Sequence, residues 1–513
     1  MPTPQQNLAA ALKELHKLQK NGRNVFSSAE LTRLARERLV RQGFLQPVVK
    51  GWLISSKPDV APGDSTPWYA SFWEFCARYC DKRFGDKWHL SPEQSLLLQA
   101  ENSSVPIQVI IYSPKGTNNT LALPFRTSLF DLKEPKAPPD RALVRRGGLR
   151  LFTPEEALIL VPEGFFTRYP IEAQVALGGI RDASSLLRLL LHGGHSVVAG
   201  RLSGALRRLG RGAVAADIFK TMKSAGYAVR ETDPFADAQP VMTAARARAA
   251  PIVGRLQAMW QTLRQPVIDI FPPPPGLPKN KKSYLKSVED IYRTDAYHSL
   301  SIEGYRVTPE LIEKVASGSW NPDKHDADRQ NRDALAARGY WQAFQAVKTT
   351  VSDIIGGDNA GTLVAGAHRD WYRELFQPCV AVGLIPAHAL AGYRNDAVFI
   401  RTSRHVPPRS EAVRDAMPAF FELLEYEPEA SVRAVLGHWL FGYIHPYFDG
   451  NGRMARFLMN AMLASGGYPW TVIRVEHRAR YLSALESASV DLDIRPFTTF
   501  LAKSHRERVS EPA

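Results

Sequence analysis

The stretch His445–Arg456 gathers, within twelve residues, side chains that could hold a polyphosphate and activate a nucleophile. A histidine can act as a base near neutral pH, a carboxylate binds hard divalent cations, and guanidinium groups pair with phosphate oxygens. Gly450 and Gly452 lack a Cβ, so their N–H groups can turn toward one anion. The polar side chains of the stretch are those of His445, Asp449, Asn451, Arg453 and Arg456.

Helical patterns flank this loop on both sides. The apolar run Val432–Ile444 leads into it and the run Met454–Leu463 leads out of it. A polar loop between two buried helices is therefore expected, with the positive dipole end of the second helix at the loop. A lone histidine at a helix end is usually structural, so the interpretation of His445 as a base depends on the whole loop.

The loop resembles the signature of the Fic family, His-x-Phe-x-Asp/Glu-Gly-Asn-Gly-Arg-x-x-Arg, and agrees with it at every polar position. Tyr447 departs from the usual Phe, which keeps an aromatic anchor and adds a hydroxyl. The resemblance implies transfer of AMP from ATP to a Tyr, Thr or Ser hydroxyl of a protein, with His445 as catalytic base and Asp449 as a Mg²⁺ ligand. The implied ATP-binding residues are Gly450, Asn451, Gly452, Arg453 and Arg456.

A second stretch, Ser299-Leu300-Ser301-Ile302-Glu303-Gly304, resembles the inhibitory motif of the same family, Ser/Thr-x-x-x-Glu-Gly/Asn. A glutamate at the end of a helix beside the nucleotide would pair with Arg456 and remove it from the γ-phosphate. The resemblance therefore predicts an autoinhibited enzyme, with the inhibitory residues Ser299, Glu303 and Gly304. The alternative is a helix that simply ends at Glu-Gly, with Gly304 just past its C-terminus.

Residues 392–400 resemble the flap of the family, a β-hairpin that pairs with the backbone of the target segment. The alternating side chains of Ala397–Ile400 fit an exposed strand edge. The expected target-binding residues are Val398, Phe399 and Ile400. A plain loop leading into Pro407-Pro408 is the alternative.

The first 58 residues are expected to form a winged helix-turn-helix. A leucine-spaced helix, a capping box at Ser27–Glu30 and two short strands between Gly43 and Ile54 support this prediction. This segment has ten basic and three acidic residues and so carries half of the formal net charge of +14. The charge favours duplex DNA, whereas a solvated face of a protein-interaction module is the alternative. The expected DNA contacts are Arg33, Arg36, Arg38, Arg41 and Lys50.

A chain of 513 residues exceeds a single core and predicts several domains. We expect a winged helix-turn-helix at 1–58, an α/β middle domain at 59–240, and a helix with a Pro-rich linker at 241–282. The remainder, residues 283–505, is expected to be an all-α Fic domain with a small β-hairpin flap. Residues 1–235 resemble antitoxin or regulator proteins of the AbiEi type, which carry a winged helix before an α/β domain.

Composition narrows the cellular setting. Three cysteines are too few for a disulfide framework, the N-terminus has no apolar signal core, and the apolar run Cys379–Ala391 is too short to span a bilayer. We expect a cytoplasmic protein with no membrane partner. Its expected partners are ATP with Mg²⁺, a protein target or the chain itself, and duplex DNA. Assembly into a homo-oligomer is a further alternative. The alternatives are another nucleotide donor, removal of AMP, or a DNA-binding or toxin–antitoxin-like regulator with the Fic unit as sensor or effector.

Overall fold

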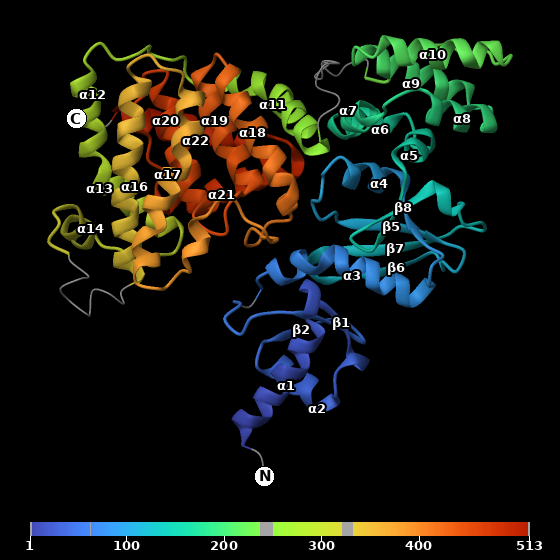
Figure 1. The fold of residues 1–513 in the computed structure, drawn as a ribbon, viewed down its shortest axis with the longest axis horizontal. Helices are drawn as coiled ribbons and strands as arrows, with labels where there is room; N and C mark the ends of the chain where they lie inside the picture. Colours follow the sequence, from blue (N-terminus) through green and yellow to red (C-terminus); the bar gives the residue numbers. More distant parts are fainter. Residues whose placement is uncertain (1–2, 62, 236–249, 321–331, 511–513) are drawn as a thin grey trace. The chain divides into compact units, whose positions relative to one another are not determined.

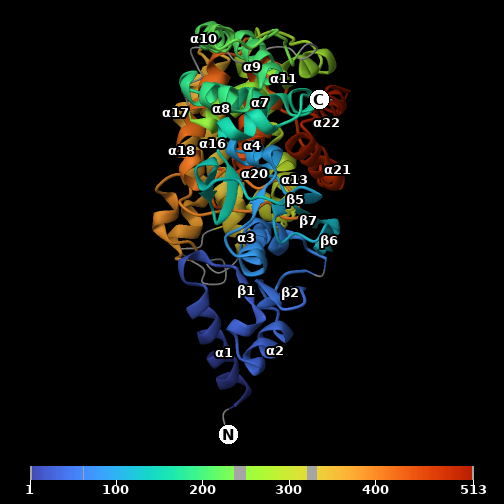
Figure 2. The same ribbon diagram turned by 90° about the vertical axis from the view of Figure 1, so that its right-hand side faces the viewer.

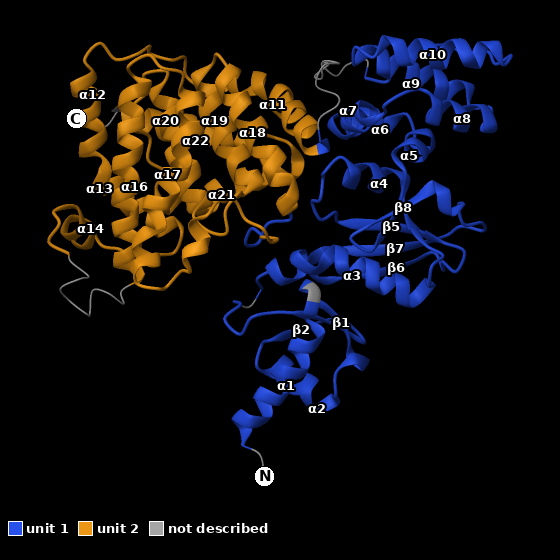
Figure 3. Ribbon diagram, in the orientation of Figure 1, with its two compact units in different colours: residues 1–251, 399–406 blue, residues 252–398, 407–513 orange. Residues whose placement is uncertain are grey.

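The computed structural model describes residues 3–61, 63–235, 250–320 and 332–510 (Figure 1). The chain divides into two compact units: unit 1 holds residues 1–251 and 399–406, and unit 2 holds residues 252–398 and 407–513 (Figure 3). No helix among the described residues is long and apolar enough to cross a membrane. The finer division into four parts stays a prediction, and residues 241–249 of the expected linker helix lie outside the described ranges.

The N-terminal part of unit 1 contains two helices, α1 and α2, beside strands β1 and β2 (Figure 2). With β3, these strands form a three-stranded antiparallel sheet in the order β1-β3-β2. Apolar side chains from both helices and from the strands form its small core, including Leu15, Phe26, Leu39 and Leu53. The elements are α1 (Pro4–Leu18), β1 (Val25–Ser27), α2 (Arg33–Arg41), β2 (Leu45–Val49) and β3 (Trp52–Ser55).

The capping box at Ser27–Glu30 predicts a helix that runs from there through Leu39. The box is present, but the predicted start is wrong. Ser27 and Glu30 make the reciprocal contacts, but these close only a single 3₁₀ turn. The chain up to Ser27 is instead held extended by pairing of β1 with β3. Helix α2 begins six residues later, where the Thr32 hydroxyl accepts the N–H of Ala35. Tertiary strand pairing has therefore overridden a local helix signal.

A mixed α/β layer follows in unit 1, as the sequence predicts for this region. The four-stranded sheet has the order β4-β5-β7-β6, with β5 and β7 parallel. Helix α3 buries an aromatic face together with Cys76 and Cys80, whose thiols are core groups. The elements are α3 (Thr66–Phe84), β4 (His89–Leu90), α4 (Pro92–Gln99), β5 (Gln108–Ser113), β6 (Asn119–Ala122), β7 (Ser128–Lys133), β8 (Leu143–Arg146) and β9 (Leu149–Phe152).

Helices complete unit 1 and share a separate apolar core. They are α5 (Pro154–Leu160), α6 (Gly164–Arg168), α7 (Pro170–Gly179), α8 (Ser184–Gly193), α9 (Ser196–Arg208) and α10 (Gly212–Ser224). The segment 399–406 also belongs to unit 1. The N–H of Val105 donates to the carbonyl of Arg404 at 2.9 Å, and the N–H of Thr402 donates to Oγ1 of Thr66 at 3.0 Å.

Among its described residues, unit 2 consists of helices and the loops between them, without a strand. Its middle is formed by α19 and α20, which are apolar and buried on nearly all sides. The helices are α11 (Pro251–Ile270), α12 (Lys281–Asp290), α13 (Tyr292–Ile302), α14 (Pro309–Ala316), α16 (Arg332–Ile354), α17 (Ala360–Ala381), α18 (Ser410–Tyr426), α19 (Ala430–Ile444), α20 (Asn451–Ala464), α21 (Arg478–Glu486) and α22 (Arg495–Ser510).

Helix α11 is packed into unit 2 through a buried carboxylate. Glu427, between α18 and α19, accepts from Nε of Arg264 at 2.9 Å and from Nε1 of Trp260 at 3.1 Å. Glu427 is only 6% exposed, and Arg264 of α11 is its ion-pair partner. This contact makes α11 a structural part of unit 2.

Replacing Glu427 by Ala should lower the free energy of unfolding by about 3–5 kcal/mol, because the Arg264 charge loses its partner. Denaturant unfolding followed by circular dichroism measures the change. Glu425→Ala is the matched control: Glu425 lies two residues away and is exposed, so its change should stay within about 0.5 kcal/mol. Equal effects of the two substitutions would contradict this role of the buried carboxylate.

Candidate active site

His445 ends helix α19 in the left-handed conformation, with φ 52° and ψ 61°. A non-glycine residue holds this conformation only where its surroundings fix it. Its Nδ1 lies 3.2 Å from the carbonyl of Gly442, so Nδ1 carries the proton and Nε2 is left as an acceptor. Burial lowers the pKa of His445 to about 4. The imidazole is therefore neutral at pH 7 and able to accept a proton.

The loop after His445 is braced by the side chain of Asn451. Its Oδ1 accepts the N–H of Tyr447 at 2.9 Å, and its Nδ2 donates to the Tyr447 carbonyl at 2.7 Å. The Tyr447 ring stacks on that of Tyr372 with centroids 3.7 Å apart. The Asn451 amide thus braces the loop, and its backbone N–H is among the first donors of α20.

Helix α20 begins at this loop without a side-chain cap from any described residue. Gly450 precedes it with φ 80°, and a Cβ there would lie 2.7 Å from the Phe376 ring. Glycine is therefore needed at 450 for both backbone conformation and space. The first N–H groups of α20 and the positive end of its dipole are left to bind an anion.

Arg453 is buried but has unused hydrogen-bond donors. The residue is 1% exposed, and its guanidinium lies between the rings of Tyr305 and Phe376, 5.2 and 5.0 Å from their centroids. Its Nε and Nη2 donate to no described residue, although Nη2 is 3.5 Å from Oδ1 of Asp449. A buried cation with open donors is suited to an anionic ligand.

Arg456 is bound by the end of helix α13. Its Nε donates to Oγ of Ser299 at 2.7 Å, and its Nη2 donates to the Ser299 carbonyl at 3.0 Å and to Oε1 of Glu303 at 2.7 Å. Burial alone would raise the pKa of Glu303, but Arg456 and Arg453 hold it below its ordinary value. The carboxylate is therefore charged at neutral pH.

The Glu303 carboxylate also lies against the start of α20. A Cβ on Gly452 would be 2.3 Å from Oε1 of Glu303, so only glycine leaves room for this contact. Gly304 follows with φ 88°, and thus terminates α13 in the usual left-handed way. Both interpretations of the Glu-Gly pair hold at once: it ends the helix and it places a carboxylate at the loop.

Asp449 is the group best placed to bind a divalent cation. Its side chain is 59% exposed, and its Oδ1 accepts the N–H of Gly450 at 2.6 Å. No cluster of three or more metal-binding side chains occurs in the described ranges. One carboxylate completed by phosphate oxygens and water fits Mg²⁺, which usually keeps several waters.

Arg394 supports the loop, a role that sequence reasoning missed. It is 1% exposed, and its Nε donates to the carbonyl of His445 at 2.8 Å. The same guanidinium donates to the carbonyls of Asp396 at 3.0 Å and of Pro408, and its backbone N–H donates to Pro446. The residue was visible only as part of the expected flap, because its partners are backbone oxygens distant in sequence.

The predicted flap hairpin is wrong: residues 392–400 contain no strand. Val398 ends the first part of unit 2, whereas Phe399 and Ile400 belong to the segment assigned to unit 1. The Asp396 carbonyl accepts from Arg394, and the N–H of Thr402, just past these residues, donates to Thr66, so the backbone on both sides of residues 397–400 has partners outside a hairpin. A role of Val398, Phe399 and Ile400 in target binding stays a prediction.

The expected DNA-contacting residues are only partly available. Nε of Arg33 pairs with Glu37 at 2.9 Å, and Arg36 and Arg38 donate to carbonyls of Ser28 and Asn7 at 3.1 and 3.0 Å. Two other basic residues stay exposed without such partners among the described residues. They are Arg41 and Lys50.

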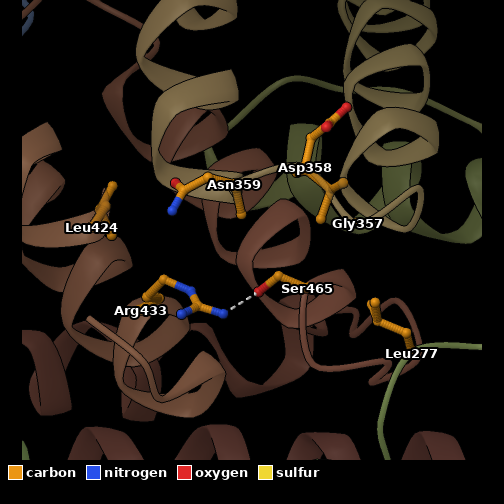
Figure 4. Close-up of a pocket in the computed structure, with 9 residues that line it drawn as sticks. Leu277, Gly357, Asp358, Asn359, Leu424, Arg433 and Ser465 are labelled. Atoms are coloured by element: carbon orange, nitrogen blue, oxygen red, sulfur yellow. Dashed lines mark hydrogen bonds between the residues drawn. The ribbon is translucent and has the colours of Figure 1, made fainter. Parts of the chain in front are cut away.

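A small cavity elsewhere in unit 2 includes no residue of the loop (Figure 4). Its Arg433 donates to Oγ of Ser465 at 2.8 Å and to the Glu427 carbonyl. These donors are used by the fold itself. We therefore do not consider this cavity a candidate active site.

The Fic/DOC family model matches residues 364–463, which span α17 to α20 and include the entire loop. Residues 364–463, most of them in unit 2, therefore match a Fic domain. The chain is 33% identical over 268 residues to "Protein adenylyltransferase Fic" of Nematostella vectensis, covering 50% of this chain and 56% of that protein. It is 27% identical over 225 residues to the protein of the same name from Drosophila melanogaster, covering 42% and 41%.

The chain thus spans about half the length of the curated relatives it matches. Among solved structures it is similar to Fic-1 of C. elegans, residues 134–508, at 19% identity and a TM-score of 0.37, covering 66% of this chain and 96% of that one. A TM-score this low adds nothing to the family match.

Replacing Arg394 by Ala should lower the free energy of unfolding by about 3–5 kcal/mol, because several buried carbonyls lose their donor. The His445 imidazole resonance should shift and broaden in NMR spectra, while that of buried His438, bonded to Tyr481, stays unchanged. Arg373→Ala removes an exposed arginine and serves as control, with a change within about 0.5 kcal/mol. An unchanged His445 resonance would rule out a positioning role for Arg394.

Proposed function

We propose that the chain is an autoinhibited protein adenylyltransferase that transfers AMP from ATP to a Tyr, Thr or Ser hydroxyl of a protein. One observation carries the proposal: an intramolecular carboxylate, that of Glu303, lies against the glycine start of α20 and on the guanidinium of Arg456. A site that holds an anion from its own chain is built for anions. The named relatives are adenylyltransferases, which favours ATP as the donor.

His445 is the catalytic base of the reaction. The target hydroxyl oxygen attacks the α-phosphorus, the bond from this phosphorus to pyrophosphate breaks, and the hydroxyl proton passes to Nε2 of His445. The neutral state of the imidazole and the contact of Nδ1 with Gly442 leave Nε2 as the acceptor. The negative charge of the transition state is stabilised by preorganised donors in a buried site.

The phosphates are held by the backbone and the arginines. The N–H groups at Asn451 and Gly452 face the α-phosphate, which passes over Gly450, whose own N–H donates to Asp449. The open donors of Arg453 take the distal phosphates. Asp449 would hold Mg²⁺, which supplies charge neutralisation of the polyphosphate when bound. These assignments need no rearrangement of the Asn451 amide, since only its backbone takes part.

Arg456 differs from Arg453, because Glu303 and Ser299 already accept hydrogen bonds from its guanidinium. In this arrangement it is unavailable to the γ-phosphate, so ATP would bind in an unproductive pose. The inhibitory contact lasts while Glu303 is ionised. Because the pKa of Glu303 is lowered in the fold, this contact is present at neutral pH and is lost only as the pH falls through that lowered value.

Glu303→Gly should raise incorporation of label from α-labelled ATP into the chain or a partner by roughly 10- to 100-fold, since a charge-assisted hydrogen bond contributes roughly 1.5–3 kcal/mol. Autoradiography and intact-mass spectra, run with ATP, UTP and CDP-choline, measure the transfer and identify the donor. The double variant Glu303→Gly, His445→Ala should be inactive, and Glu310→Ala, a change at an exposed glutamate, should behave as wild type. Labelling that survives the loss of His445 would refute the mechanism.

A second function, binding of duplex DNA by the N-terminal part of unit 1, is favoured by one arrangement. Helix α2 leads directly into the hairpin β2–β3, and β1 completes the sheet in the order β1-β3-β2. A helix followed by such a wing is the pattern of winged helix-turn-helix proteins. Arg41 at the end of α2 and Lys50 at the hairpin turn are exposed and would contact phosphates.

If this second proposal is correct, the full chain binds duplex DNA with an affinity that falls as salt rises. Arg41→Glu with Lys50→Glu should weaken binding by about tenfold or more, through loss of two phosphate contacts and added repulsion. Arg373→Glu, an exposed charge reversal in unit 2, should leave DNA binding unchanged. Fluorescence anisotropy with a labelled duplex is the measurement, and affinity independent of salt would refute the proposal.

A further inference from the structure

A groove of about 640 Å³ opens in unit 2 beside the catalytic loop. Its volume is in the range of ligand-binding pockets, roughly 300–1,000 Å³. Three parts of the domain line it: α17, the segment 388–395 and α18. Phe448, from the loop itself, completes the lining.

The lining of this groove is cationic. It includes Arg369 and Arg414 and contains no carboxylate side chain. The Arg369 guanidinium stands 5.1 Å from the centroid of the Tyr393 ring, and Nη2 of Arg414 donates to Oδ1 of Asn395 at 2.6 Å. Both arginines are exposed, and neither forms an ion pair with a carboxylate in the described ranges. Their charges are therefore available to an incoming anion.

The groove is continuous with the residues that hold His445. Phe448 stands three positions after the histidine and is 49% exposed, so its ring is accessible to a bound segment. The Tyr393 ring lies 5.6 Å from that of Tyr447, and the next residue, Arg394, donates to the His445 carbonyl. A segment bound in the groove would thus lie next to the base.

We infer that this groove binds the protein substrate, and that it selects a segment with Asp or Glu near the modified hydroxyl. The carboxylates pair with Arg369 and Arg414, while an apolar side chain of the segment covers Phe448. This inference rests on the proposed adenylyl transfer. ATP is not the expected occupant, because its phosphates have their own donors on Arg453 and α20. A nucleic acid is not expected either, because two arginines are too few to bind successive backbone phosphates.

The test uses two fluorescein-labelled peptides of equal length, each with a single Tyr, one flanked by Asp and Glu and the other by Lys. Anisotropy titrations use the full chain carrying Glu303→Gly. The acidic peptide should bind at least about tenfold more tightly than the basic one, and less tightly at high salt, because exposed charges are screened. Equal affinity for the two peptides would overturn the inference.

Charge reversal locates the binding. Added singly to the Glu303→Gly chain, Arg369→Glu and Arg414→Glu should each weaken binding of the acidic peptide by about tenfold, through loss of a charge-assisted contact. Lys503→Glu, an equal charge change on α22 and outside the groove lining, should not. A fluorescent ATP analogue should bind all these variants equally. Loss of its binding in the groove variants would make the nucleotide the occupant and overturn the inference.

AMP transfer to the same peptides separates the two proposals. Transfer to the acidic peptide should exceed transfer to the basic one and should fall in the groove variants. Transfer without any preference for acidic flanks refutes the groove assignment but leaves the enzyme. Charge-selective binding without transfer from ATP to any protein or peptide refutes the proposed enzyme but leaves a peptide-binding groove.

Discussion

The burial of three guanidinium groups around one loop is the constraint on which the active site depends. A buried charge is costly unless it is paired or hydrogen-bonded. Arg394 meets this requirement with backbone carbonyls, and Arg456 meets it with Ser299 and Glu303. Arg453 relies on two aromatic rings and keeps donors unused. The loop is thus preorganised for an anion, and its own helix α13 supplies one.

Inhibition in this arrangement is a competition between anions. Glu303 is covalently part of the chain, so it meets Arg456 at a high effective concentration. A nucleotide must offset the loss of that contact before its γ-phosphate can bind the same guanidinium. Helix α13 is itself held by other contacts, including Nε of Arg478 on the Ile302 carbonyl at 2.7 Å. Whatever loosens α13 therefore favours the active state.

Sequence reasoning reached those parts of the site in which residue type and spacing are sufficient. The loop His445–Arg456 could be predicted because glycines, a histidine and arginines at fixed intervals have few other uses. Glu303, which contacts Arg456 from 153 positions away, was reached only through a family resemblance. Arg394 and Phe376 were missed because their roles depend on tertiary packing. The helix at Ser27 failed because long-range pairing of β1 with β3 overrode a local pattern. The flap hairpin failed because the buried Arg394 side chain, and no partner strand, holds the backbone of that segment.

The segment 399–406 has a consequence for how the chain can be divided. Unit 1 includes eight residues that lie within the sequence of unit 2, so the polypeptide passes between the units three times. No single cut yields two complete pieces. A fragment starting at residue 252 would carry this segment without Thr66 and Val105, its hydrogen-bonding partners. Proteolytic nicking of unit 1 could therefore remove hydrogen-bonding partners of residues 399–406, which lie within the range matched by the Fic family and a few residues after Arg394.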